Sequence, residues 1–318
     1  MQKLPAGGPQ PFEIRIRAED AEQRLDNFLF RHLKSVPKSH VYRLVRTGQV
    51  RVNGKRRKPE YRLEEEDIVR IPPVRQAEVT EPGRPPDALL KRLKAAILYE
   101  TPELLIINKP AGVAVHGGSG VSFGVIELLR AIYPDAPFLE LVHRLDRDTS
   151  GCLMVARKRS MLRYLHQALR DAHGIEKTYL ALVVGRWPER KRQVSAPLRK
   201  NTLQSGERMV RVDDEGRESV TEFAVKERFA ETTLIEAKPI TGRTHQIRVH
   251  AAHAGHPIAG DEKYGGDDTN RKLRESGLSR LFLHAASLRF LLPHAKQPLT
   301  VAAPLPPELE RVLKLLRG

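Results

Sequence analysis

The densest run of polar residues in the chain is HRLDRDTSG at positions 143–151, between the apolar stretches FLELV and CLMVARK. A turn of this composition between two strands is often purely structural, with its Asp side chains accepting hydrogen bonds from nearby backbone N–H groups. The alternative is chemical, because Arg144 and Arg147 flank Asp146 and would keep its carboxylate ionised, while the strands would hold it in place. Asp146 is therefore a candidate catalytic carboxylate, and its spacing alone leaves both interpretations open.

A second polar cluster, TGRTHQIRVH at positions 241–250, follows the apolar run LIEAKPI. Basic groups at a strand-to-helix junction often bind phosphate through the N–H groups of the helix N-terminus, although a basic helix face without function is the alternative. His250, His253 and His256 continue at intervals of three and raise the question of a metal site. Because the sequence has no HExxH motif, no cysteine pair and no obvious acidic fourth ligand, we expect no metal and interpret these histidines as RNA-facing or packed.

Other kinds of catalytic site find little support in the sequence. The glycine-rich stretch NKPAGVAVHGGSGVSFG lacks the GxxxxGK[ST] and GxGxxG patterns, so we expect a mobile or substrate-facing loop and no nucleotide hydrolysis or dinucleotide binding. No Ser lies in a GxSxG motif, and Cys152 lies in an apolar strand, which disfavours a Ser or Cys hydrolase. Tyr179 lies in the apolar run EKTYLALVVG, where a core tyrosine bonded through its hydroxyl is the ordinary interpretation.

The elements expected in the first part of the chain form a compact unit over residues 12–72. Alternating apolar and polar residues predict a short edge strand at 12–17, and a second helix is expected to end at Gly48. The segment QVRVNGKRRKP predicts a hairpin, with a turn at Asn53 and Gly54 and a basic return strand. The first helix is predicted from apolar residues at helical spacing, which are Leu25, Phe28, Leu29 and Leu33.

Basic residues are concentrated within this first unit. Between Arg31 and Lys58 the chain has ten Lys or Arg and no Asp or Glu. A solvated surface is the simpler interpretation, but the charges interleave with helix and hairpin periodicity, so we expect them to share a face that can follow a phosphate backbone. The candidate RNA-binding residues of this unit are Lys38, Arg43, Arg46, Arg51, Lys55, Arg56, Arg57 and Lys58.

The rest of the chain is expected to be a linker and a second, larger domain. Residues 73–94 are rich in Pro and polar residues, which is typical of linkers, and the second domain should span 95–318. Its apolar β-type runs do not alternate regularly with helices, which disfavours a doubly wound parallel sheet. The sequence instead predicts an α+β fold with a mixed, mainly antiparallel sheet. We expect peripheral helices at 125–133, 160–170, 246–255 and 308–316.

The composition of the whole chain indicates the kind of partner. The 318 residues include 55 Lys or Arg and 39 Asp or Glu, a formal charge of +16, which favours a polyanion, nucleic acid before an anionic membrane. Neither a run of roughly 18 apolar residues nor an apolar signal core is present, so we expect no membrane association and a cytoplasmic location. A single cysteine excludes an internal disulfide framework, and 5% aromatic residues argue against a generic single-strand binder.

Four segments, taken in order, resemble the motifs of the RluA-type family of pseudouridine synthases. They are ELLIINKPAGVAVH, HRLDRDTSG, EKTYLALVVG and GRTHQIRVHAAHAGHPIAGDEKYG. The N-terminal unit resembles an S4-type RNA-binding domain. Three further segments, VPKSHVYRLVRTGQVRVNGKRRKPEYRL, VHGGSGVSFGVIE and LQSGERMVRV, are similar to a subgroup that acts on large-subunit ribosomal RNA. The resemblance implies that the partner is 23S rRNA or a large-subunit assembly intermediate, that several uridines are modified, and that the protein is a monomer that needs no cofactor.

The resemblance also implies roles for individual residues. Asp146 would be the catalytic carboxylate, Arg248 its basic partner, and Tyr179 the ring that stacks on the target base, while Arg144 would fill the space left by the extruded nucleotide. Cys152 stands where the family commonly has Val or Leu. We expect the ion pair with Arg248 to outweigh burial and keep Asp146 ionised. The RNA-binding set in this domain comprises His143, Arg144, Arg147, Arg243 and His245.

The chemistry implied by the resemblance is the isomerisation of uridine to pseudouridine in a base that has left its stack. Asp146 could attack C1′ to form a sugar ester or abstract the C2′ proton to give a glycal, and the sequence leaves both routes open. A non-catalytic rRNA-binding or assembly factor would use the same basic surfaces without needing Asp146. A histidine-based metal hydrolase is the third alternative.

Overall fold

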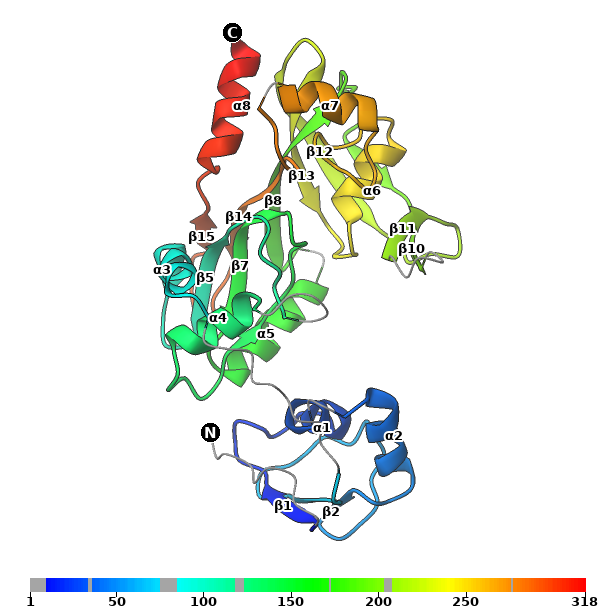
Figure 1. The fold of residues 1–318 in the computed structure, drawn as a ribbon, viewed down its shortest axis with the longest axis vertical. Coiled ribbons are helices and arrows are strands. Elements are labelled where there is room, and N and C mark those ends of the chain that lie inside the picture. The colour runs from blue at the N-terminus through cyan, green and yellow to red at the C-terminus, as the bar shows by residue number, and fades with distance from the viewer. Residues whose placement is uncertain are drawn as a thin grey trace. The chain divides into compact units, whose positions relative to one another are not determined.

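A computed structural model describes residues 10–33, 36–74, 85–117, 123–171, 173–202, 208–275 and 277–318. The chain divides into two compact units, Met1–Arg84 and Pro85–Gly318, each of which we describe by itself (Figure 1). Residues 75–84 of the predicted linker, and residues 118–122 of the glycine-rich loop, lie outside the described ranges. Within those ranges, no helix has both the length and the apolar character needed to span a membrane.

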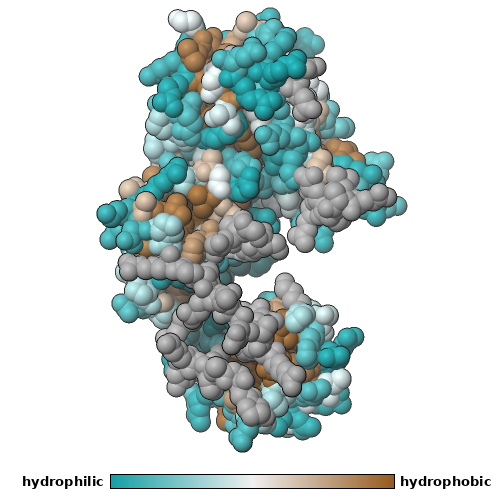
Figure 2. Space-filling view, viewed as in Figure 1, coloured by the Kyte–Doolittle hydropathy of each residue, from teal (hydrophilic) through white to brown (hydrophobic). Residues whose placement is uncertain are grey.

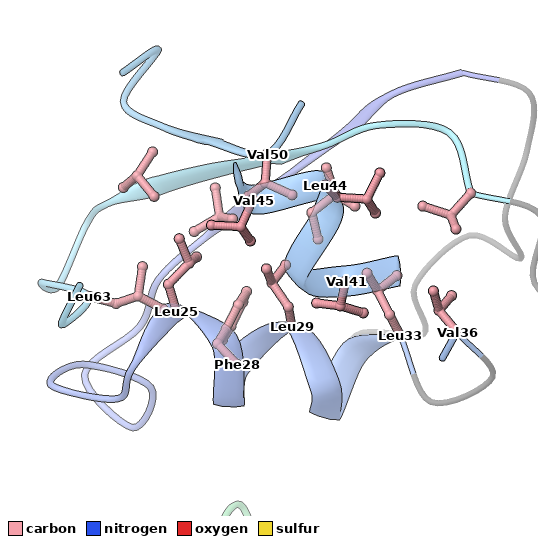
Figure 3. Packing of buried hydrophobic residues seen from close by; sticks show 14 of the residues in the cluster. Leu25, Phe28, Leu29, Leu33, Val36, Val41, Leu44, Val45, Val50 and Leu63 are labelled. Atoms are coloured by element: carbon pink, nitrogen blue, oxygen red, sulfur yellow. The ribbon is translucent and has the colours of Figure 1, made fainter. Parts of the chain in front are cut away.

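The first unit packs two helices on a small antiparallel sheet. Its strands lie in the order β1-β3-β2, which places β1 at an edge, as the alternation predicted. Figure 3 shows that the apolar side chains of α1 and α2 point toward one another, and Leu25, Phe28, Leu29 and Val41 are almost completely buried. The elements are β1 (Phe12–Arg15), α1 (Leu25–His32), α2 (Lys38–Arg46), β2 (Arg51–Val52) and β3 (Ile68–Ile71).

The predicted hairpin is right in its turn and wrong in its second strand. Asn53 and Gly54 both have positive φ angles, 50° and 72°, as a type I′ turn requires, and Lys55 bridges back to Val52. The basic residues that follow form no strand, and β3 pairs with β2 instead. The physical reason is burial: β3 contributes Val69 to the core, whereas the run KRRK has no apolar side chain to bury.

The second unit is built on a ten-stranded sheet with the main order β4-β5-β7-β14-β8-β13-β12-β9, while β6 pairs with β7 and β15 with β14. Among the described strand pairs only β7 and β14 run parallel, so the sheet is mixed and mainly antiparallel, as predicted. Its strands are β4 (Ile97–Glu100), β5 (Leu104–Lys109), β6 (Glu140–Leu141), β7 (Ser150–Ala156), β8 (Ile175–Val184), β9 (Gln193–Ser195), β12 (Val220–Arg228), β13 (Thr232–Pro239), β14 (Leu283–Phe290) and β15 (Leu299–Ala302).

Helices cover both faces of this sheet. Strand β5 is buried on each side, because Leu105 and Ile107 pack with α3 and α4 while Leu104 and Ile106 pack with α5. Figure 1 shows α3, α4 and α5 around β5 and β7, whereas α6 and α7 lie near β12 and β13. The helices are α3 (Asp87–Ala95), α4 (Val125–Ile132), α5 (Arg159–Arg170), α6 (Gln246–His253), α7 (Asp267–Glu275) and α8 (Pro307–Arg317).

Three further features differ from the sequence prediction: helix α3, helix α7 and a separate two-stranded sheet. Helix α3 lies within the stretch interpreted as linker, because Leu89, Leu90 and Leu93 recur at helical spacing and pack into the core of the second unit. Helix α7 was not predicted, and neither was the separate two-stranded sheet of β10 (Leu198–Thr202) and β11 (Arg208–Val212).

The face shown in Figure 2 is largely hydrophilic, with hydrophobic residues visible only in small areas.

Candidate active site

A cavity of about 570 Å³ in the second unit brings the two polar clusters of the sequence together. One wall is the turn that precedes β7, which contributes residues 143–146 and Thr149. The opposite wall is the junction between β13 and α6, residues 239–248, and β8 contributes Lys177 and Tyr179. The junction and the turn are about a hundred residues apart in the sequence, and only the folded sheet makes them neighbours.

The carboxylate of Asp146 lies in this cavity with its side chain 18% exposed. Its Oδ2 atom is 3.4 Å from Nη1 of Arg248 and 3.7 Å from Nε2 of His245. No group in the described part of the chain hydrogen-bonds its other oxygen, Oδ1. The carboxylate therefore has one oxygen directed toward basic groups and one available to a ligand.

The orientation of Arg248 is fixed by a carboxylate that the sequence analysis did not single out. Asp261, whose side chain is fully buried, accepts Nε of Arg248 at 2.7 Å and Nη2 at 2.8 Å. Asp261 Oδ1 also accepts the backbone N–H groups of Lys263 and Tyr264. Burial is the largest single influence and would lower the pKa of Arg248, but the hydrogen bond with Asp261 and the negative charges of Asp261 and Asp146 together outweigh it, so the net pKa is raised. Arg248 thus stays charged, with Nη1 left to face Asp146.

His245 connects Asp146 to the β10–β11 sheet. It precedes α6 in a left-handed conformation (φ 53°), and its Nδ1 lies 2.8 Å from the Tyr264 hydroxyl, which accepts the backbone N–H of Val210 at 3.0 Å. This arrangement favours a phenol that donates to Nδ1 and a ring whose Nε2–H faces Asp146. Burial lowers the pKa of His245, and the negative charge of Asp146 only partly opposes this shift. The imidazole ring is therefore neutral at pH values above the ordinary pKa of histidine.

Tyr179 lines the same cavity from β8. Its cross-strand neighbours are Ala237 and Ala285, which share its face of the sheet and are too small to cover its ring. No described residue hydrogen-bonds its hydroxyl, so the interpretation of a core tyrosine bonded through that group is not what the structure shows. Burial and the nearby negative charge of Asp146 raise the pKa of Tyr179, which keeps the phenol neutral.

Comparisons with known proteins agree with this geometry. Residues 103–253 match the RNA pseudouridylate synthase family model, and residues 23–69 match the S4 domain. Ribosomal large subunit pseudouridine synthase C of Escherichia coli (strain K12) is 57% identical to this chain over 308 residues, which cover 96% of each protein. The chain belongs to the RluA-type pseudouridine synthase family.

Other relatives extend the match to organisms and structures beyond Escherichia coli. The protein of the same name from Pasteurella multocida (strain Pm70) is 54% identical over 96% of this chain and 93% of its own length. The solved structure of human RNA pseudouridylate synthase domain containing 4 has a TM-score of 0.59 and 27% identity, covering 73% of this chain and 96% of the human one. The protein is an RNA pseudouridine synthase, an isomerase, with an S4 domain before an α+β catalytic domain.

The turn that carries Asp146 in this synthase is held from behind by two basic side chains. Lys109 is fully buried, and its Nζ donates to the carbonyl oxygens of Pro110, Val113 and Arg147, each at 2.9 Å. Burial lowers the pKa of Lys109 to about 7, but three acceptors match the three N–H donors of the charged form. Arg280 donates to the carbonyl oxygen of Asp148 at 3.3 Å. These contacts fix the backbone on which Asp146 is placed.

The structure gives different surroundings to the other predicted residues of the catalytic domain. His143 accepts the backbone N–H of Met154 through Nε2, and burial lowers its pKa to about 4, so it is a neutral structural group and not a cationic RNA contact. Arg144, Arg147 and Arg243 are exposed, and Arg144 and Arg243 also line the cavity. Arg147 Nε lies 3.3 Å from Oδ1 of the neighbouring Asp148.

In the described structure, the three histidines at intervals of three do not form a metal site. His250 is fully buried, with Nδ1 next to the Thr221 hydroxyl and Nε2 next to the Ala196 carbonyl oxygen. His256 bonds the carbonyl oxygen of Val184. The described residues contain no group of three or more His, Cys, Asp or Glu side chains placed to hold a metal ion. His250 and His256 are therefore packed residues, which is one of the two interpretations that the sequence allowed.

The basic residues of the S4 domain are mostly free of acidic partners. In the described structure no carboxylate pairs with those at positions 43–58, and all but Arg57 are exposed. Arg57 lies over the Tyr61 ring at 4.4 Å. Arg56 donates to the carbonyl oxygen of Arg46, which joins the end of α2 to the loop after β2. The side chain of Lys38 lies outside what the structure describes.

Proposed function

We propose that this synthase converts several uridines of 23S rRNA to pseudouridine in the cytoplasm, on free rRNA or on a large-subunit assembly intermediate, with Asp146 as the catalytic carboxylate. The substrate class is supported by the names of relatives that are 54–57% identical over nearly the whole chain. The observation that carries the catalytic role is the position of Asp146 in the lining of the cavity, with Oδ2 directed at Arg248 and Oδ1 without a hydrogen-bond partner among the described residues.

The reaction breaks the N1–C1′ bond, joins C5 to C1′ and moves one proton from C5 to N1, so atoms and electrons balance without a cofactor. In one route Oδ1 of Asp146 attacks C1′, uracil leaves with the bonding electron pair, and C5 later displaces the ester. In the other route the carboxylate takes the C2′ proton and a glycal forms as uracil leaves; C5 then adds to C1′ as the carboxyl group returns the proton to C2′. Both routes need an ionised carboxylate, and the charged guanidinium of Arg248 stabilises that form.

The target base must leave its helix to reach Asp146, at a cost of a few kcal/mol. A cavity of about 570 Å³ is of the size that holds small-molecule ligands, and the partly buried Tyr179 ring in its lining offers a surface on which uracil can stack. Contacts elsewhere on the RNA offset the unstacking energy. We assign these contacts to Arg144, Arg147 and Arg243 in the catalytic domain. In the S4 domain we assign them to Lys38, Arg43, Arg46, Arg51, Lys55, Arg56, Arg57 and Lys58.

The first test compares Asp146→Asn with the wild type and with Asp135→Asn, which changes an exposed carboxylate of the same domain. We expect Asp146→Asn to bind an rRNA transcript as the wild type does and to form no pseudouridine, because the neutral amide neither attacks nor deprotonates the sugar. Asp135→Asn should keep full activity. Pseudouridine formed by Asp146→Asn at the wild-type rate would reject the catalytic role.

The second test concerns the substrate. We expect 23S rRNA from cells that lack the protein to lose pseudouridine at defined positions, and these should return with the wild-type gene and not with Asp146→Asn. An unchanged pseudouridine map of 23S rRNA would reject this substrate while leaving the isomerase assignment intact.

A further inference from the structure

The lining of the active-site cavity carries more positive charge than the mechanism uses. The described residues that line it include a single carboxylate, Asp146, and five Lys or Arg side chains. The charge of Arg248 is matched by the buried carboxylate of Asp261. Arg243 donates to a backbone carbonyl oxygen and not to a carboxylate. The basic side chains that remain without an acidic partner in the described structure are Arg144, Arg170, Lys177 and Arg243.

Lys177 is the least exposed of these four and the one whose position is best defined. It lies on β8 two residues before Tyr179, so the two side chains share the face of the sheet that lines the cavity. Two residues along a strand span about 7 Å, the order of size of one nucleotide. Burial lowers the pKa of Lys177, and no nearby carboxylate opposes the shift. Its charge in turn contributes to the low pKa of His143.

The opposite face of the same strand is different. There, Glu176 accepts Nζ of Lys238 at 2.7 Å and lies 3.9 Å from Arg289, so basic groups on that face have an acidic partner. Among the described residues, the absence of a carboxylate beside Lys177 is therefore a local feature of the cavity. An ammonium group that is partly buried without a partner is costly unless a ligand supplies the negative charge.

We propose that Lys177 binds a phosphodiester group adjoining the flipped uridine, at the end of the cavity away from Asp146. This inference rests on the proposed role of Asp146 and on base flipping. A uracil carbonyl is the weaker candidate, because it is neutral and because the base has to lie near Tyr179 and Asp146 for the reaction to proceed. A phosphate carries the charge that the ammonium lacks, and it follows the sugar into the cavity when the nucleotide leaves its helix. Lys177 thus stabilises the extruded state.

The test pairs a change in the protein with a change in the RNA. The protein variants are Lys177→Met, Lys177→Arg and, as a control, Lys238→Met, which removes the same charge from the other face of the sheet. The RNA is any short substrate that the enzyme modifies, made with a neutral methylphosphonate at the phosphate 5′ or 3′ of the target uridine. Single-turnover kcat/KM for pseudouridine formation is measured for each combination.

On unmodified RNA we expect Lys177→Met to lower kcat/KM roughly 10- to 100-fold, as for the loss of a charged hydrogen bond, and Lys238→Met to change it little. A methylphosphonate at one of the two positions should slow the wild type by a similar factor and should not slow Lys177→Met further. Lys177→Arg, which keeps the charge, should remain sensitive to it.

The proposal is overturned if methylphosphonates at both positions slow Lys177→Met as much as they slow the wild type, or if Lys177→Met matches Lys238→Met on unmodified RNA. Thermal melting checks that each variant folds, and Lys177→Gln replaces the Met variant if that one does not. Rejection of 23S rRNA as the substrate changes only the RNA used as the probe, so that failure is distinguishable from failure of the Lys177 contact.

Discussion

Replacement of Asp261 by Asn tests whether this buried carboxylate holds Arg248 beside Asp146, the proposed catalytic carboxylate. Oδ1 of Asp261 accepts Arg248 Nη2 and the backbone N–H groups of Lys263 and Tyr264, while Oδ2 accepts only Arg248 Nε at 2.7 Å. An Asn at this position keeps its oxygen toward the three donors. Its NH₂ group then faces the Arg248 Nε–H, so that two donors meet where an ion pair existed.

The size of the effect follows from burial. The side chain of Asp261 is 0% exposed and that of Arg248 is 8% exposed, so breaking their pair leaves the buried guanidinium with Asp146, at 3.4 Å, as its remaining acidic neighbour in the described structure. Such a change typically costs about 3–5 kcal/mol, and we expect the free energy of unfolding to fall by about 3 kcal/mol, since three of the four bonds can persist. Arg248 would also lose its fixed direction toward Asp146, which should lower kcat by about tenfold or more.

The assay combines denaturant unfolding with single-turnover pseudouridine formation at saturating enzyme. Glu262→Gln is the matched control, because it removes the same charge from the exposed neighbouring residue. RNA affinity should change little in Asp261→Asn, since Asp261 is away from solvent. If Asp261→Asn has the same unfolding free energy and the same rate as Glu262→Gln, the argument that Asp261 orients Arg248 is wrong.

Three further predictions concern the ring of Tyr179, the buried His284 and the basic residues of the S4 domain. Tyr179→Phe should keep most of the pseudouridine-forming activity, because no described residue hydrogen-bonds the hydroxyl. Tyr179→Ala should raise the activation free energy by roughly 1–3 kcal/mol, because the base can no longer stack on the ring. Similar rates for both variants would argue against stacking. Burial lowers the pKa of His284 from 6.5 to about 4. Between these two pH values, His284 therefore binds a proton in the unfolded chain and not in the folded chain. The free energy of unfolding should therefore fall by up to roughly 3 kcal/mol between pH 6.5 and 4, and the drop should be smaller in His284→Gln than in the wild type. Changing Arg43, Arg46 and Arg56 together to Gln should lower the slope of log Kd against log salt by about 0.7–0.9 for each phosphate that these side chains neutralise in the wild type, and an unchanged slope would remove them from the RNA surface.

The sequence was most informative about features that depend on a single helix, strand or motif. Apolar spacing predicted α1, with Leu25, Phe28 and Leu29 inward, and the motifs singled out Asp146, Arg248 and Tyr179, which the fold brings to one cavity. Periodicity is a local property, and so is a motif. Neither one requires knowledge of which distant strands become neighbours.

What could not be predicted depends on contacts between distant segments. Asp261 lies in the segment GHPIAGDEKYG that resembles the family's basic motif, yet its partner is set by the way the chain returns after α6. One signal was available: an Arg on a buried helix needs a nearby carboxylate. Lys109 and Lys177 were missed for a similar reason, because burial and the presence or absence of partners are properties of the folded chain. Helix α3 was obscured by the prolines that precede it.

In water the two oxygens of a carboxylate are equivalent and exchange roles freely. In this enzyme the equivalence is broken before any RNA arrives, because the guanidinium of Arg248 and the imidazole of His245 both approach Oδ2 of Asp146. On the proposed role of Asp146, the oxygen atom that meets the sugar is then determined by the protein, and rotation of the carboxyl group would exchange the two oxygens. The difference between the two oxygens is thus a consequence of the fixed positions of helix α6 and of the turn before β7.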